Sequence, residues 1–176
     1  MQDRDLLIEE LEKFYSEVEK VKVKLEYLNK NNLNCKKGCS ACCIDGITVF
    51  EIEAEYIFAK SRSLKRSLKL ENAGNKNGKC VFLNDENGCL IYEFRPYVCR
   101  TQGLPLRWID FDENDELVEF RDVCPLNYQG KSIEKLDEKY FWEIGPFERK
   151  LSDLQVKYFN NGNRIELRKL YEKIKD

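Results

Sequence analysis

Eight cysteines are the residues of this chain whose type and spacing could do chemistry. Four of them crowd one loop, Cys35-Lys-Lys-Gly-Cys39-Ser-Ala-Cys42-Cys43, in which Cys39 and Cys42 have the two-residue separation of a metal-binding knuckle. Thiolates on a short loop repel one another unless a cation offsets their charge, so this density favours bound metal. We expect Cys35, Cys39 and Cys42 to share one centre.

Cys43 directly follows Cys42, and adjacent side chains diverge in most backbone conformations. We therefore expect the two thiols to differ in role: one of them could ligate a second centre, hold another iron of a cluster or remain a free redox thiol. The remaining predicted ligands are dispersed through the middle of the chain, at Cys80, Cys89, Cys99 and Cys124.

Arg95 and Arg100 flank Cys99 and are expected to lie around a site of this kind, because the charge of four thiolates exceeds that of a divalent ion. Their alternative role is that of solvated surface charges. The chain has no histidine, which excludes histidine-dependent triads, mixed cysteine and histidine zinc sites and two-histidine iron sites.

Composition points to a cytoplasmic protein that binds neither nucleic acid nor membrane. The formal net charge is -2, from 30 basic and 32 acidic side chains, so no overall field would gather a polyanion. The amino-terminal segment is charged, and no stretch is apolar enough for a signal peptide or a membrane span. Thiols stay reduced in the cytoplasm, which favours metal ligands over disulfides. The alternative is that the cysteines are buried as small apolar residues.

We expect one domain of the α+β class, mainly α, in which helices from both ends of residues 1–176 frame a small irregular cysteine-rich core with a few short strands. The amino-terminal helix, over residues 1–30, is indicated by an apolar stripe that favours packing on the chain's own core over a dimeric coiled coil. The stripe consists of Leu7, Leu11, Phe14, Val18, Val21, Leu25 and Leu28. Asn31, Asn32 and Asn34 are expected to end this helix.

The metal-binding core is expected to cover residues 35–124, followed by carboxy-terminal helices over 132–176. Within the core, the patterns predict a β-like run at 47–50, a helix at 51–70, a loop at 71–79, a strand at 80–83 with a turn at 84–88, and a hairpin of 106–111 with 117–120. The later patterns predict helices from residue 132, from 146 to about 160 after a break at 145–146, and from 163.

The cysteine pattern resembles the bacterial cysteine-cluster proteins of the YkgJ type (CxxxCxxCC), which are described as zinc- or iron-chelating and often named iron–sulfur proteins. The resemblance covers residues 35 to about 124. It is carried by the double-cysteine loop, by Cys80-Val81-Phe82-Leu83, and by Cys89, Ile91, Tyr92, Arg95, Pro96, Cys99 and Arg100. It implies metal binding, and because a flagellin lysine methylase carries a similar cysteine domain, it also implies methyl transfer from S-adenosylmethionine as an alternative.

An iron–sulfur cluster of the 4Fe-4S type is the expected cofactor, with zinc as the alternative, because scattered cysteines suit a cluster and zinc prefers paired knuckles. The spacing of Cys35, Cys39 and Cys42 is also similar to that of radical S-adenosylmethionine enzymes. A helix precedes this loop, however, and no alternating strands and helices follow it, so we reject their barrel.

Three function classes remain open. The first is a redox or metal-handling protein whose partner is the metal ion or cluster. The second is an enzyme, either an S-adenosylmethionine-dependent protein methyltransferase or an oxidoreductase, that uses the iron–sulfur centre. The third is a protein-interaction module stabilised by zinc.

Overall fold

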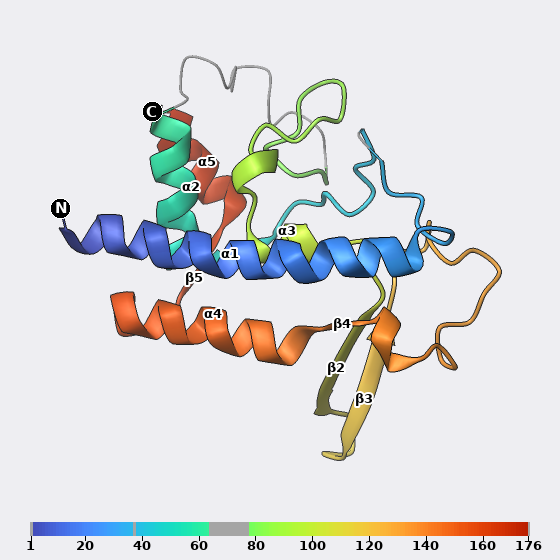
Figure 1. Cartoon of the computed structure of the whole chain (residues 1–176). Coiled ribbons are helices and arrows are strands. Elements are labelled where there is room, and N and C mark those ends of the chain that lie inside the picture. The colour runs from blue at the N-terminus through green and yellow to red at the C-terminus, as the bar shows by residue number, and fades with distance from the viewer. Residues whose placement is uncertain (1, 37, 64–77, 176) are drawn as a thin grey trace.

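The computed structural model describes residues 2–36, 38–63 and 78–175. Its longest element is helix α1 (Gln2–Asn29), which crosses the whole molecule in Figure 1. Leu11 and Val18 of the predicted stripe are fully buried, whereas Val21 is 37% exposed. Burial of the stripe within a single chain agrees with the prediction that α1 packs on its own core. No helix among the described residues is long and apolar enough to cross a membrane.

Helix α4 (Ile144–Phe159) lies alongside α1 and runs in the opposite direction (Figure 1). Lys157 contacts Glu10 at 2.7 Å and Lys150 forms an ion pair with Glu17, as expected for two antiparallel helices. The remaining elements, in chain order, are β1 (Thr48–Phe50), α2 (Glu51–Ser63), the 3-10 helix η2 (Tyr92–Phe94), α3 (Tyr97–Thr101), β2 (Leu106–Phe111), β3 (Leu117–Asp122), the 3-10 helix η3 (Glu138–Tyr140), β4 (Trp142–Glu143), β5 (Arg164–Glu166) and α5 (Leu167–Lys175). The predicted mainly α fold with a few short strands is confirmed.

Two small sheets connect distant parts of the chain. In the first, β1 pairs antiparallel with β5, which places α2 and α5 together on one side of α1. In the second, β3 pairs with β2 as a hairpin, and β4 pairs with β2 in parallel. The hairpin turn is held by Asp112, whose carboxylate accepts the N–H groups of Asn114 and Glu116. The predicted hairpin is therefore confirmed, and it projects away from the helices in Figure 1.

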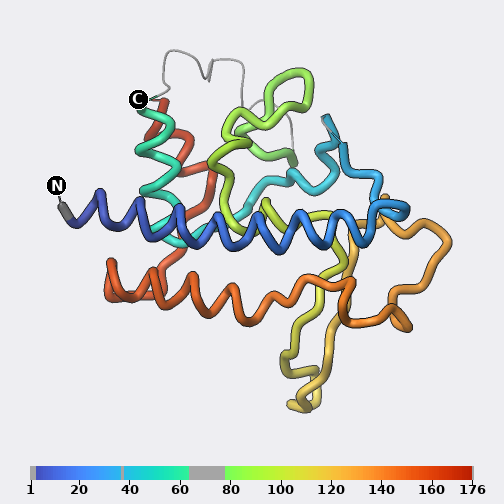
Figure 2. Tube along the Cα trace, in the orientation of Figure 1, coloured from blue at the N-terminus to red at the C-terminus, as the bar shows by residue number. Residues whose placement is uncertain are grey.

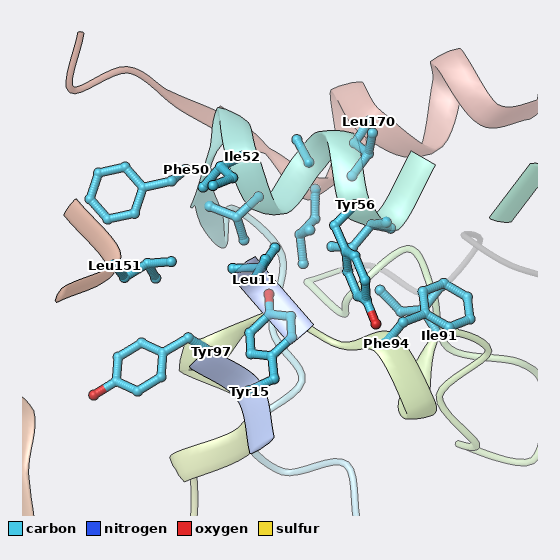
Figure 3. Close-up of a cluster of buried hydrophobic side chains, with 14 of the residues drawn as sticks. Leu11, Tyr15, Phe50, Ile52, Tyr56, Ile91, Phe94, Tyr97, Leu151 and Leu170 are labelled. Carbon is cyan, nitrogen blue, oxygen red and sulfur yellow. The ribbon is translucent and has the colours of Figure 1, made fainter. Parts of the chain in front are cut away.

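The core fills the space between α1, α2, α3 and α4, and Figure 3 shows its aromatic and aliphatic side chains. A buried carboxyl group lies within it. Glu53 of α2 accepts hydrogen bonds from the Tyr15 hydroxyl (2.9 Å) and the Tyr97 backbone N–H (2.7 Å). Burial raises the pKa of Glu53 above its ordinary value, and these hydrogen bonds oppose that rise. Glu53 thus ties α2 to both α1 and α3 from inside the core.

The predicted helix from residue 132 is wrong. The Arg121 side chain of β3 donates hydrogen bonds to the carbonyl groups of Ile133, Glu134 and Leu136. These carbonyls would otherwise accept the N–H groups of a helix, so the segment forms turns and only the short η3, which Asp137 caps.

Three other boundaries differ from the predictions. Residues 164–166, expected in a helix, form β5 because β1 offers them a strand partner, and α5 begins at Leu167. The break expected at 145–146 falls inside the first turn of α4, where a proline needs no intrahelical N–H partner. The strand expected at 80–83 is reduced to the isolated bridge Leu83–Cys89. The expected helix at 51–70 is observed as far as Ser63, and residues 64–77, with most of the expected loop, lie outside the described residues.

Candidate metal centre

The cysteine-bearing segments gather beside the carboxy-terminal half of α1. The Cys80 N–H donates to the Cys43 carbonyl (3.1 Å), and the Asp45 N–H donates to the Gly78 carbonyl (3.2 Å). A β-bridge between Ile44 and Lys79 lies between these hydrogen bonds. Figure 2 shows the resulting contact between the loop after α1 and the segment that follows residue 78. Backbone pairing therefore brings the double-cysteine loop against the first of the dispersed cysteines.

Cys35 lies where three segments meet. The Asn127 side chain, only 3% exposed, donates to the Cys35 sulfur (3.4 Å) and to the Gly103 carbonyl (2.7 Å). Its oxygen accepts the Asn34 N–H at 2.6 Å. Gly103 has a φ of +97°, and a Cβ atom at this position would lie 2.5 Å from the Cys35 sulfur. Only glycine therefore leaves room for this thiol at the turn after α3.

Cys39 and Cys124 lie in the same neighbourhood as Cys35. Burial raises the pKa of the Cys35 thiol, and nearby Cys39, Cys124 and Cys42 raise it further, whereas the hydrogen bond from Asn127 lowers it. The Asn127 N–H also donates to the Cys124 carbonyl at 2.8 Å. The segment that carries Cys124 is thus fixed to the amino-terminal cysteine loop.

Further hydrogen bonds fasten the segment after Cys124 to the end of α1. The Asn29 side chain donates to the Tyr140 carbonyl at 3.0 Å and accepts from the Tyr128 hydroxyl. The Tyr128 N–H donates to the Asn32 carbonyl at 2.9 Å. Asn32, which the sequence suggested only as a helix terminator, therefore also holds the segment after Cys124, together with Asn29.

Cys80, Cys89 and Cys99 form a second neighbourhood with Cys43. The backbone N–H groups of Phe82 and Ile91 lower the pKa of Cys80 and Cys89, each two residues earlier in the chain. N–H groups near sulfur stabilise a thiolate and tune a metal bound to it. Helix α3 presents Cys99 to the same place.

Burial is the main cause of raised pKa values in this second neighbourhood. It raises the pKa of Cys89 to about 11 and moves the pKa of Cys99 further upward, with additional contributions from the neighbouring thiols. Without metal these thiols keep their protons at neutral pH. Metal binding must therefore displace protons, and its apparent affinity rises with pH.

Cys42 and Cys43 stand at the junction of the two neighbourhoods. Their thiols lie close enough to act on each other, which raises the pKa of Cys42 well above its usual range and lowers that of Cys43. The expectation that the two thiols differ in role stays a prediction. The contact is local, because the turn at Cys42, whose carbonyl accepts the Ile44 N–H, keeps the two residues on one side of the loop.

The cationic side chains near the cysteines are only partly those that the sequence suggested. Arg95 lies close enough to Cys89 to lower its pKa, and its guanidinium also covers the Tyr92 ring at 3.9 Å. Arg100 is 5% exposed, pairs with Glu19 at 2.9 Å and joins α3 to α1.

Two cations that the sequence analysis did not single out act on cysteines. Lys79 lowers the pKa of Cys42, and Arg168, paired with Asp45 at 2.8 Å, lowers that of Cys80. Asn127 and Gly103 were missed as well. The spacing of Asn127, three residues after the last cysteine, is the one local signal that could have drawn attention to it.

The donor chemistry fits a zinc or iron centre held by sulfur. Eight thiols, backbone N–H donors to sulfur, and nearby cations surround the site, and no histidine competes. Among residues 2–36, 38–63 and 78–175, no three cysteine, aspartate or glutamate side chains already stand in an arrangement that could hold a metal ion. Binding would therefore require the thiols to turn toward one another.

Comparison with protein families supports this chemistry. A family model named CxxCxxCC, described as a "putative zinc- or iron-chelating domain", matches residues 34–125, from just before the first cysteine to just after the last. No curated protein and no solved structure is significantly similar to the chain. The match covers more than half of the chain and all eight cysteines, and the chain belongs to this family of zinc- or iron-chelating domains.

Proposed function

We propose that this chain is a cytoplasmic, single-domain protein that holds an iron–sulfur centre of the 4Fe-4S type through its cysteines and serves in redox chemistry or metal handling. Zinc is the alternative occupant. The observation that carries the proposal is the convergence of cysteines from the loop after α1, the segment 80–99 and the segment at 124 on one side of the molecule.

Dispersed thiols favour iron–sulfur over zinc, because a cluster accepts ligands from scattered positions and this chain has one knuckle-like pair, Cys39 and Cys42. When bound, an iron–sulfur cluster supplies one-electron transfer. The residues of the chain would set its properties: the N–H groups of Phe82 and Ile91 stabilise negative charge on sulfur, and Arg95 offsets part of that charge.

The enzyme alternative has one supporting observation, a cavity beside α3, the helix that carries Cys99. The cavity has a volume of about 210 Å³ and is lined by Glu53, Thr101, Glu148 and Arg164, among others. Pockets for drug-sized ligands usually measure roughly 300–1,000 Å³, and S-adenosylmethionine belongs to that size class. This cavity is therefore smaller than the usual site for a ligand of that size class.

The test is the metal and acid-labile sulfide content of the protein purified without oxygen, together with its absorption spectrum. Iron with matching sulfide and a broad visible band supports the proposal. Stoichiometric zinc without colour replaces the iron–sulfur assignment with a zinc-stabilised module. Saturable binding of S-adenosylmethionine in calorimetry would instead support the enzyme alternative.

A further inference from the structure

We propose that the eight cysteines form two separate metal centres. Cys35, Cys39, Cys42 and Cys124 hold the first centre, and Cys43, Cys80, Cys89 and Cys99 hold the second. This inference rests on the proposed metal-binding function, and it adds how many centres there are, which thiols share each one, and how the two differ.

The first set is held together from three sides. Asn127 contacts the Cys35 sulfur, and its own N–H holds the Cys124 carbonyl at 2.8 Å. The Cys39 N–H donates to the Lys36 carbonyl at 2.9 Å, which turns the loop so that Cys39 follows Cys35 around one curve. Cys35 interacts electrostatically with Cys39, Cys124 and Cys42, the other three members of this set.

The second set is held by a different group of hydrogen bonds. Backbone pairing joins Cys43 to Cys80, and the bridge Leu83–Cys89 brings Cys89 back toward Cys80. Cys43 interacts electrostatically with Cys80, Cys89 and Cys99, in addition to its contact with the adjacent Cys42. The two neighbourhoods thus differ in both their scaffold and their members.

Cys42 and Cys43 interact with each other, and Cys42 also interacts with Cys35 of the first set and Cys99 of the second. Cys43 completes a four-thiol set with Cys80, Cys89 and Cys99, whereas the first set has three members without Cys42. Four thiolates are the usual complement of a structural zinc ion or of an iron–sulfur cluster. Cys42 therefore belongs to the first centre, so that the adjacent Cys42 and Cys43 bind different centres.

The chemistry balances at each centre. Four thiols lose four protons to solvent, four sulfur–metal bonds form, and a divalent ion leaves a net charge of about -2 on the four-thiolate site. Lys79 lies near Cys42 at the first centre, and Arg95 and Arg168 lie near Cys89 and Cys80 at the second. Each centre therefore has cationic side chains that offset its excess negative charge.

The two centres differ in exposure. Cys35 and Cys42 of the first set are exposed, whereas Cys39, Cys124 and all four cysteines of the second set are partly buried. A chelator in solution can reach exposed sulfur ligands before buried ones. The first centre should consequently exchange its metal with solution, and the second should retain it.

The test uses zinc(II), because thiolate sites accept zinc whichever metal they hold in the cell. Apoprotein is loaded without oxygen and desalted, and zinc is counted by mass spectrometry for the wild type, Cys124→Ser and Cys89→Ser. The matched control is Ser40→Ala, a change in the same loop that removes no thiol. The expected result is two ions in the wild type and the control, and one ion in each cysteine variant.

Because Cys89→Ser could fail to fold, a second measurement uses only wild-type protein. Zinc release to a chromogenic chelator should proceed in two phases of equal amplitude. Alkylation after the fast phase should label Cys35, Cys39, Cys42 and Cys124 before the other thiols. One ion per chain, lost completely in both variants, or a single release phase with uniform labelling, would overturn the division while leaving metal binding intact. No zinc uptake by the wild type would instead defeat the proposed function itself.

Discussion

Replacing Gly103 with alanine tests whether the turn after α3 is shaped to admit the Cys35 sulfur. The new Cβ would lie 2.5 Å from that sulfur and 3.5 Å from the amide nitrogen of Asn127, on a backbone with a φ of +97°. Rotation of the Cys35 side chain about its Cα–Cβ bond can move the sulfur away, which relieves the overlap. This rotation gives up the hydrogen bond from Asn127 and turns the thiol away from its neighbours.

The expected magnitude has two parts. Holding alanine at positive φ costs about 1–2 kcal/mol. Losing the hydrogen bond from Asn127 to Cys35 adds about 1 kcal/mol. Gly103→Ala should therefore lower the free energy of unfolding by roughly 2–3 kcal/mol in urea titrations. It should also reduce the zinc content of the loaded protein by one ion, because Cys35 leaves the first centre.

Gly130→Ala is the matched control, because Gly130 has a φ of +73° and nothing within 4 Å of the added Cβ. It should show the backbone cost of about 1–2 kcal/mol alone, with full zinc content. A double variant refines the comparison: in a Cys35→Ala background, Gly103→Ala should cost no more than Gly130→Ala. If Gly103→Ala matches Gly130→Ala in both stability and zinc content, the close approach of Cys35 is not required and this reasoning is wrong.

Four further changes have defined outcomes. Cys39→Ser should lose bound metal and lower the melting temperature, and full retention of both would show that Cys39 is no ligand. Asn127→Asp keeps the acceptor but replaces the amide donor with a negative charge. It should lower the free energy of unfolding by about 1–3 kcal/mol and weaken zinc binding. An unchanged zinc affinity would contradict the contact between Asn127 and the Cys35 sulfur. Burial raises the pKa of Glu53 above 4.5. The contribution of Glu53 to stability is therefore fully present below about pH 4.5 and is lost as pH rises through the raised pKa. Glu53→Gln should remove this loss of stability in urea titrations across that pH range, and an unchanged pH dependence would assign the loss to other groups. Arg100→Lys should lower the melting temperature by loosening α3 from α1 while metal content stays full, and metal loss at unchanged stability would instead place Arg100 at the centre.

Elements defined by local pattern were predictable from the sequence. The apolar stripe of α1 and the hairpin of β2 and β3 follow from side chains that repeat with the period of their own element. The segment after residue 132 was not predictable, because Arg121 takes its carbonyl groups from 12 to 15 positions away. For the same reason β5 was missed: residues 164–166 become a strand only because β1 reaches them from the other end of the chain.

The candidate site divides along the same line. Counting and spacing predicted all eight cysteines as metal ligands, because thiols gather on a short loop and the chain has no histidine. Their grouping depends on contacts that spacing does not encode, such as the hydrogen bond between Asn127 and Cys35, which are 92 positions apart. Arg100 shows that closeness in the chain does not ensure a contact with the site. It is close to Cys99 in the chain, yet its guanidinium is turned toward Glu19 of α1.

The length of α1 has a consequence for cooperativity. Its amino-terminal half packs in the apolar core through residues such as Leu11, whereas Asn29 at its end holds the segment that follows Cys124. Local opening normally spreads through units that share contacts, and one continuous helix makes these two regions share theirs. Metal that orders the thiol loops would therefore slow amide hydrogen exchange in the last turns of α1 as well as in the loops. Metal binding would therefore be detectable as slower amide exchange in α1, although this helix provides no ligand.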